Sequence, residues 1–221
     1  MSELRAEGRA PGVQRIGLLG GTFDPIHWGH LIMAEEARQQ ARLDRVLFLP
    51  AGEPPHKVGQ AITPIAHRLQ MVQLAIASHP AFALSRLDVD RPGPHYSVDM
   101  VRLFLEQAPA GTEAFFLVGA DSLEDMPTWK DPAGLLDLCQ VLAMSRPGHG
   151  PDLERLAQVL PAVRVRVQVL QMPLIGISGT DIRRRVREGR SIRYLVPEEV
   201  RQYILAHGLY RAQEPAEGPS P

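Results

Sequence analysis

Residues 15–30 have the sequence Arg-Ile-Gly-Leu-Leu-Gly-Gly-Thr-Phe-Asp-Pro-Ile-His-Trp-Gly-His, a short apolar run that ends in a glycine pair and leads to two histidines. The run from Arg15 to Gly20 is typical of a buried strand that feeds a tight loop. Small and apolar side chains then recur at helical spacing, at Met33, Ala34, Ala37 and Ala41. Residues 46–49, Val-Leu-Phe-Leu, indicate a second buried strand that stops at Pro50. Strand, helix and strand in this order predict a right-handed crossover.

The same alternation continues along the chain. We expect a helical stripe of Leu69, Val72 and Ile76, a strand from Phe82 to Leu87, a helix with Val98, Val101 and Leu105, and strands from Ala114 to Val118 and from Val141 to Met144. Between Val163 and Val169, valines at every second position predict a half-exposed strand near the sheet edge. Helices from Thr180 and Pro197 close the chain. The pattern predicts a Rossmann-like α/β fold with a doubly wound, mostly parallel sheet, a small C-terminal helical part, and ligands at the carboxyl ends of the strands.

The length of 221 residues suits one substantial domain with a single core. We expect this domain to span residues 15–211, after a flexible N-terminal extension at 1–14. Residues 212–221 are rich in Pro, Glu, Gly and Ala without a large apolar side chain, which predicts a disordered tail. The proline-rich loop from Gly52 to Pro64 is either a mobile surface loop or a substrate lid.

Composition narrows the class of partner. The formal net charge is -1, so the chain as a whole attracts neither nucleic acid nor anionic membranes. Cys139 is the single cysteine, which excludes an intrachain disulfide and a multi-cysteine metal site and fits a reducing compartment. We therefore expect a soluble, cytoplasmic protein with small-molecule substrates, bound to neither membrane nor nucleic acid. The sequence leaves open whether it forms a homo-oligomer.

The loop after the first strand has the features of a phosphate site. Gly20 and Gly21 let a ligand approach the backbone because no Cβ stands in the way. His27 and His30 lie three residues apart where a helix begins, and backbone N–H groups point outward there. The loop is neither a Gly-x-Gly-x-x-Gly fingerprint nor a P-loop. The plainer alternative is a glycine turn followed by ordinary surface or cap histidines and a core Trp28.

A second anion site is predicted near residue 180. Ser178 and Asp181 have the spacing of a capping box, so they mark a helix N-terminus. Its first turns carry cations, at Arg183, Arg184, Arg185 and Arg187. The alternatives here are a plain helix cap with a solvated basic face, or an RNA-binding patch, although the latter is expected to come with a basic net charge.

These motifs carry a family resemblance. Gly-Thr-Phe-Asp-Pro followed by His-x-Gly-His resembles the signature of the nucleotidylyltransferase superfamily, and its full form at residues 20–30 resembles the bacterial nicotinate-nucleotide adenylyltransferase branch. Further matching segments follow in order from about Arg15 to Tyr210. The resemblance implies adenylyl transfer from ATP to nicotinic acid mononucleotide, which yields nicotinic acid adenine dinucleotide and pyrophosphate in NAD biosynthesis.

The resemblance also implies roles for individual residues. The implied catalytic residues are His27, His30 and Arg183. The implied ATP-binding residues are Gly20, Gly21, Thr22, Phe23, His27, His30, Gly119, Asp121, Arg146, Ile177, Ser178, Thr180 and Arg183. Gly179 departs from the family pattern, which has a second serine there. Magnesium is expected to arrive on the ATP phosphates, because no dense carboxylate cluster offers it a protein cage.

The acceptor side rests on three further segments that resemble the family. Pro-His-Lys at residues 55–57 is similar to the segment that meets the mononucleotide phosphate, whereas residues 88–99 and 129–130 look like the nicotinate pocket. The implied mononucleotide-binding residues are Thr22, Lys57, Tyr96, Ser97, Trp129 and Lys130. Lys57 could instead be a solvated lysine, and Tyr96 and Ser97 could be a helix cap or a packed ring.

Two rival functions remain open at this level. One is a sister transferase that prefers nicotinamide mononucleotide, because the spacing of residues does not show the single carboxylate contact that would distinguish the acid from the amide. A third acceptor, phosphopantetheine, is disfavoured by the Pro-His-Lys segment and Trp129. The other is a non-catalytic nucleotide sensor, for which Gly179 is the one supporting feature.

Overall fold

The computed structural model describes residues 13–52, 62–146 and 150–211. The strands are β1 (Arg15–Gly21), β2 (Arg45–Pro50), β3 (Phe82–Leu84), β4 (Glu113–Gly119), β5 (Gln140–Ser145) and β6 (Val167–Gln171). The helices are α1 (Trp28–Gln40), α2 (Ile65–Ile76), α3 (Ser97–Gln107), α4 (Ala120–Glu124), α5 (Pro132–Leu138), α6 (Leu153–Val159), α7 (Val163–Arg166), α8 (Gly179–Arg187) and α9 (Glu198–Ala206), and η2 (Met126–Thr128) is a 3-10 turn. Among the described residues, no helix is long and apolar enough to cross a membrane.

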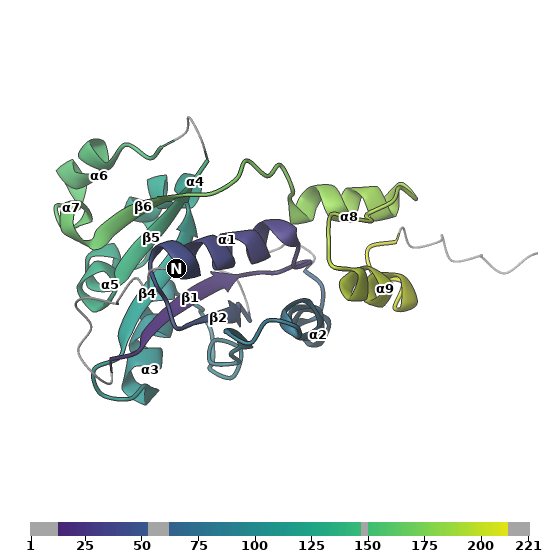
Figure 1. Ribbon diagram of the computed structural model, residues 1–221, viewed down its shortest axis with the longest axis horizontal. Helices are drawn as coiled ribbons and strands as arrows, with labels where there is room; N and C mark the ends of the chain where they lie inside the picture. Colours follow the sequence, from purple (N-terminus) through teal and green to yellow (C-terminus); the bar gives the residue numbers. More distant parts are fainter. Residues whose placement is uncertain (1–12, 53–61, 147–149, 212–221) are drawn as a thin grey trace, which may run out of the picture.

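The strands form one parallel sheet in the order β3-β2-β1-β4-β5-β6 (Figure 1). Leu18 of β1 pairs with Leu47 of β2 on one side and with Phe116 of β4 on the other. The chain builds outward from β1 to β3, then crosses back and builds outward again from β4 to β6. The order therefore reverses between β1 and β4, and a crevice opens at this switch point at the carboxyl ends of the strands. The predicted doubly wound α/β fold is confirmed.

Each face of the sheet is covered by its own group of helices. Along β4, Phe115 and Leu117 belong to one buried cluster and Phe116 and Val118 to the other, as expected for side chains that alternate across a strand. The first cluster contains residues of α1, α2, α8 and α9, and the second contains residues of α3 to α7. Helices α8 and α9 lie together at one end of the molecule (Figure 1).

The strand predicted from Phe82 to Leu87 was too long. Strand β3 ends at Leu84, and the N–H of Ser85 makes a last hydrogen bond to Phe48 O. The chain then turns, with the N–H groups of Val89 and Asp90 bonded to the carbonyl of Arg86. The side chains of Arg86 and Asp90 pair across this turn at 2.7 Å. The apolar residue at 87 therefore lies in a turn and not in a strand.

The strand predicted from Val163 to Val169 was wrong in its first half. Residues 163–166 form α7, and β6 starts at Val167, although β6 does lie at the sheet edge as predicted. Val163 and Val167 are both buried while Val165 is exposed. A strand would place Val165 on the same face as Val163 and Val167, whereas a helix turns it away, so the alternation indicated a strand and only the spacing of four fits both structures.

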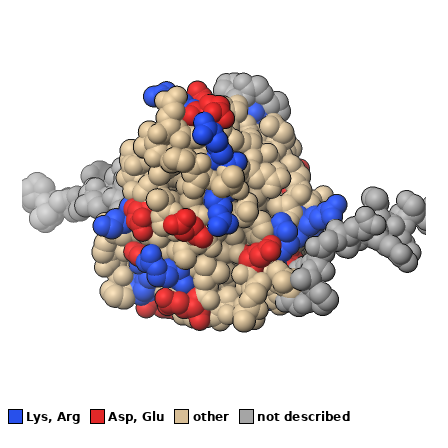
Figure 2. Space-filling model, turned by 90° about the vertical axis from the view of Figure 1, so that its left-hand side faces the viewer, with Lys and Arg blue, Asp and Glu red and all other residues tan. Residues whose placement is uncertain are grey.

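On one face of the molecule, charged side chains lie in mixed groups (Figure 2). Figure 2 shows the face at the left of Figure 1, where basic and acidic side chains are neighbours and do not form one continuous basic area. An example is Arg164, whose Nη2 lies 2.8 Å from Oε2 of Glu154. Pairs of this kind on exposed surfaces contribute little to stability.

Candidate active site

Two adjoining cavities lie at the carboxyl ends of the strands. The larger, of about 680 Å³, reaches the ends of β1, β2 and β4, and the smaller, of about 410 Å³, lies toward β5 and the chain before α8. Five residues line both cavities: His30, Met33, Gly119, Asp121 and Arg146. Two ligands bound here would therefore meet at His30, at the switch point of the sheet.

The two histidines of the first loop form one stacked pair. The ring centroids of His27 and His30 are 3.8 Å apart with an interplanar angle of 25°. The backbone N–H of His27 donates to Nδ1 of His30 at 3.3 Å. The proton of a neutral His30 ring therefore sits on Nε2, where a ligand can accept it. Nδ1 of His27 is buried and has no hydrogen-bond partner among the described residues.

Both imidazoles are neutral at physiological pH. Burial lowers the pKa of His27 from 6.5 to about 4. Burial also lowers the pKa of His30 well below 6.5, and the neighbouring His27 adds to this effect. Each neutral ring thus offers one N–H donor. A bound phosphate would raise both pKa values, because a nearby negative charge favours the protonated form.

A glycine makes the close packing of His27 possible. A Cβ at position 29 would lie 3.0 Å from Nδ1 of His27 and 3.1 Å from its Cε1. The His27 ring therefore lies directly against the first turn of α1 in space that a side chain would occupy. The glycine between the two histidines therefore leaves room for the ring at this position.

Phe23 supports the histidine pair from the core. Its side chain is 2% exposed, and its ring makes an edge contact with His30 at a centroid distance of 5.0 Å. Its φ of 49° lies in the left-handed region, which an L side chain seldom adopts. Phe23 thus lies beneath the histidine pair and lines neither cavity. The family resemblance had implied that it binds ATP.

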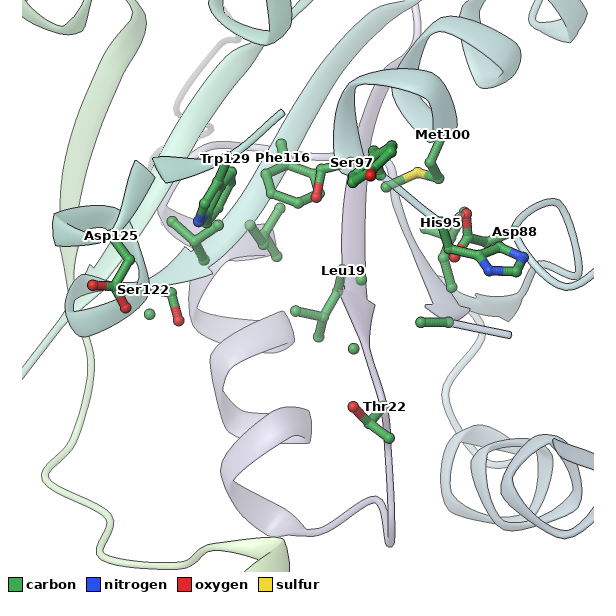
Figure 3. Close-up of a pocket in the computed structure, with 18 of the residues that line it drawn as sticks. Leu19, Thr22, Asp88, His95, Ser97, Met100, Phe116, Ser122, Asp125 and Trp129 are labelled. Carbon is green, nitrogen blue, oxygen red and sulfur yellow. The ribbon is translucent and has the colours of Figure 1, made fainter. Parts of the chain in front are cut away.

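An aromatic wall lines the larger cavity. The rings of Trp129 and Phe116 meet edge to face at a centroid distance of 6.1 Å, and Ser97 lies beside them (Figure 3). Lys130 and Tyr96 line the same cavity. Tyr96 is the N-cap of α3, which begins at Ser97, so the helix cap that the sequence left open is present at the edge of this cavity. Flat apolar rings beside the free N–H groups of a helix start can receive an aromatic acid.

A buried ion pair holds the chain that leads to Tyr96. Nη2 of Arg91 lies 2.6 Å from Oδ1 of Asp88, and both side chains are largely buried. The guanidinium also donates to the carbonyls of Pro94 and Tyr96. Asp88 and His95 line the larger cavity on the side away from Trp129 (Figure 3).

The start of α8 lies next to the smaller cavity. Ile177 lines this cavity, but Ser178, Thr180 and Arg183 line neither. Oγ of Ser178 caps α8 by accepting from the N–H of Asp181 at 3.2 Å. The Asp181 carboxylate accepts from Arg184 and Arg185, so much of the predicted basic stripe is locally paired.

Arg183 points to the first loop. Its Nη1 donates to the carbonyl oxygen of Asp24 at 2.6 Å, and its Nη2 to Oγ1 of Thr180 at 3.4 Å. A Cβ at position 179 would lie 2.9 Å from that same Asp24 oxygen. Gly179 therefore allows α8 to approach the loop more closely than a serine would without a shift of backbone. This contact gives the departure from the family pattern a physical reason.

The structure brings most of the predicted site residues to the two cavities. The larger is lined by Gly20, Gly21, Thr22, His30, Tyr96, Ser97, Gly119, Asp121, Trp129, Lys130 and Arg146, and the smaller by His27, His30, Gly119, Asp121, Arg146 and Ile177. Lys57 lies outside the described residues. Within the described part of the chain, no group of three or more His, Cys, Asp or Glu side chains could hold a metal ion.

Sequence reasoning missed several apolar lining residues. Met33 lines both cavities, while Met100 and Phe116 line the larger. Phe116 offered a signal, because it lies near the carboxyl end of a predicted central strand, where ligands bind. The two methionines lie on the apolar faces of their helices, and their spacing does not distinguish a core residue from a lining residue.

Comparison with known proteins places the chain among nucleotide-transferring enzymes. The cytidylyltransferase-like family model matches residues 18–185. The chain is 53% identical over 202 residues to a protein of Thermomicrobium roseum named "Probable nicotinate-nucleotide adenylyltransferase", covering 91% of this chain and 94% of that protein. A protein of the same name from Thermus thermophilus is 48% identical, covering 89% of this chain and 100% of its own.

Solved structures share the fold at lower identity. The nicotinic acid mononucleotide adenylyltransferase of Plasmodium falciparum, complexed with NaAD, superposes with a TM-score of 0.73 at 18% identity, covering 89% of this chain and 97% of that chain. Its complex with APC gives a TM-score of 0.71 at the same identity and the same coverage. Both agree with the parallel doubly wound architecture.

Proposed function

The chain belongs to the cytidylyltransferase-like family and, within it, to the nicotinate-nucleotide adenylyltransferases, and we propose that its two adjoining cavities bring ATP and nicotinic acid mononucleotide together. The enzyme transfers the adenylyl group of ATP to the mononucleotide, giving nicotinic acid adenine dinucleotide and pyrophosphate in NAD biosynthesis. The observation that carries the spatial proposal is that His30, Asp121 and Arg146 line both cavities.

We assign the smaller cavity to ATP. Asp121 at the start of α4 would accept from the ribose hydroxyls, and Arg146 after β5 would lie beside adenine. Gly119 and Ile177 line this cavity as well. Gly20 and Gly21 line the larger cavity and would meet ATP where the two cavities adjoin. Ser178, Thr180 and Arg183 belong to the N-cap and first two turns of α8, which follows Ile177, so we assign them to the outer phosphates of the triphosphate. Magnesium would enter with ATP, since it keeps several waters and binds through substrate phosphates.

We assign the larger cavity to the mononucleotide. Its nicotinate ring would lie against the rings of Trp129 and Phe116, which meet edge to face in the wall of this cavity. Its carboxylate would be received by the N–H groups at the start of α3, near Tyr96 and Ser97. Thr22 and Lys130 line the same space. Lys57 is assigned to the 5′-phosphate on the family resemblance of its segment.

The reaction needs positioning and charge stabilisation. An oxygen of the mononucleotide phosphate attacks the α-phosphorus of ATP, a new P–O bond forms, and the bond to the bridging oxygen breaks with its electron pair leaving on pyrophosphate. The attacking oxygen is already anionic at neutral pH, so no protein base is required. His27 and His30 would donate hydrogen bonds to the α-phosphate and the departing group, where negative charge increases.

A pyrophosphate-release assay tests the proposal. The enzyme is mixed with MgATP and, in separate reactions, nicotinic acid mononucleotide, nicotinamide mononucleotide and phosphopantetheine. The nicotinic acid form should give the highest kcat/KM. A higher kcat/KM for nicotinamide mononucleotide would overturn the assignment of nicotinic acid mononucleotide as the acceptor. If ATP binds but no acceptor gives pyrophosphate release, the result would favour a non-catalytic nucleotide sensor.

A further inference from the structure

We propose that Arg68 of α2 is a positioning residue that holds the wall of the mononucleotide cavity in its binding shape through four backbone carbonyls. Its Nη1 donates to Thr22 O at 2.9 Å and to Ala51 O at 2.8 Å, its Nη2 donates to Gly52 O at 3.0 Å, and its Nε donates to Thr63 O at 2.9 Å. The identity of the ligand rests on the proposed function.

These four carbonyls belong to three segments that are separate in the sequence. Thr22 lies in the loop after β1, Ala51 and Gly52 follow the end of β2, and Thr63 precedes α2. A second contact joins two of these segments, because the N–H of Thr63 donates to Oδ2 of Asp24 at 3.3 Å. The guanidinium is therefore the point at which both strand ends and the entry to α2 meet.

The burial of Arg68 indicates that this arrangement serves more than packing. The side chain is 2% exposed and shares the buried face of α2 with Leu69, Val72 and Ile76. Burying a cation is costly, whereas an apolar residue at this position would avoid that cost. Burial lowers the pKa of Arg68, and the charge of Asp24 opposes the shift. Four of the five N–H donors of the fork are used, which a lysine could not match.

Arg68 is bonded to residues that line the larger cavity but to none that line the smaller one. Thr22 and Ala51 line the larger cavity, and none of the four bonded residues lines the smaller one. Loosening these bonds would lower the fraction of molecules whose larger cavity is ready to bind. The apparent affinity for the mononucleotide is proportional to the fraction of molecules in the binding-competent shape. If that fraction falls to about one tenth, KM for the mononucleotide rises about tenfold. KM for ATP should stay within about twofold under the same relation.

The test compares Arg68→Lys and Arg68→Gln with the wild type. KM for each substrate, kcat, and the Kd for nicotinic acid mononucleotide by calorimetry are measured. Arg155→Lys and Arg155→Gln are matched controls, because Arg155 lies exposed on α6, away from both cavities. A purely structural loss would reduce the amount of active enzyme and hence kcat, but would leave both KM values unchanged. KM does not depend on the folded fraction, so partly unfolded variants remain informative.

The expected result is a selective rise in KM and Kd for the mononucleotide, larger for Gln than for Lys, with no change in the Arg155 variants. Unchanged KM values, an equal rise for both substrates, or the absence of folded protein for both Arg68 variants would overturn the positioning role. A wild type that does not turn over the mononucleotide would instead reject the proposed function, and calorimetry would then decide on Arg68 alone.

Discussion

The hydroxyl of Tyr210 donates a 2.6 Å hydrogen bond to Oδ1 of Asp24, which joins the chain after α9 to the loop that precedes His27. Asp24 is 6% exposed, and its backbone carbonyl accepts from Arg183. Burial and the neighbouring carboxylate raise the pKa of Tyr210, so its hydroxyl remains a donor at neutral pH. The end of the described chain is therefore part of the support of the candidate active site.

Tyr210→Phe should destabilise the protein. The substitution removes one hydrogen bond and leaves a buried carboxylate oxygen with one partner fewer, which costs about 1–3 kcal/mol. The free energy of unfolding is measured by urea denaturation at pH 7.5. Tyr194→Phe is the control, because Tyr194 is 82% exposed. Equal stabilities of the two variants would show that the bond to Asp24 contributes nothing.

His27→Ala should lower kcat while the fold survives. Loss of one positioned hydrogen-bond donor to a charge that grows in the transition state reduces turnover by about two to four orders of magnitude. Steady-state pyrophosphate release and far-UV circular dichroism measure the two effects. His207→Ala, at an exposed position, is the control. Near-normal turnover of the His27 variant would remove the histidine from the reaction.

Much of the fold was predictable because buried parallel strands are short, apolar and punctuated by glycine or proline. The run that ends at Gly20 and Gly21 and the one that stops at Pro50 both became central strands. The errors arose where local patterns were ambiguous, as at Val163 and Val167, whose spacing fits a helix and a strand equally. Helix α5 was missed although Asp131 and Pro132 are an N-cap and a first-turn proline.

The candidate site was predictable where a motif lies within one segment. The His27–His30 pair follows from its own loop, but the supports of that loop come from distant parts of the chain. Arg68 and Tyr210 reach it only after folding, and no pattern in the sequence pairs Tyr210 with Asp24. One signal was present, because Arg68 lies four residues before Val72 on the apolar stripe of α2, where a cation is unexpected.

Gly29→Ala should separate activity from stability. Alanine favours the helix over glycine by about 0.5–1 kcal/mol, so the unfolding free energy should hold or rise. The new methyl group would press on the ring of His27, with contacts of 3.0 and 3.1 Å, and shift it by a few tenths of an ångström. We expect kcat to fall about tenfold or more, since a misplaced catalytic group loses rate steeply. A variant that keeps full kcat would show that turnover does not depend on the position of the His27 ring against Gly29.

Gly179→Ser introduces the serine that the family resemblance implies at this position but should impair this protein. Its Cβ would meet the Asp24 carbonyl at 2.9 Å, which forces α8 away from the loop and breaks the bond from Arg183. Overpacking of this kind costs about 1–3 kcal/mol. Gly176→Ser is the matched control, because nothing lies within 4 Å of a Cβ at that position. Thermal unfolding and KM for ATP are compared, and a Gly179 variant that matches the control would show that the backbone adapts without cost.

The buried histidines should make stability depend on pH between about 6.5 and 4, as follows from the lowered pKa of His27. In this window the unfolded chain binds more protons than the folded one, so the free energy of unfolding falls as pH decreases. A shift from 6.5 to about 4 corresponds to a loss of about 3 kcal/mol at the acid end. Urea unfolding at pH 7.5 and pH 5 measures the slope above the range in which the carboxylates of Glu35 and Glu198 take up protons. His27→Asn should flatten the slope and His207→Asn should not, whereas a slope unchanged in both would mean that the His27 ring is hydrated and carries its charge in the folded state.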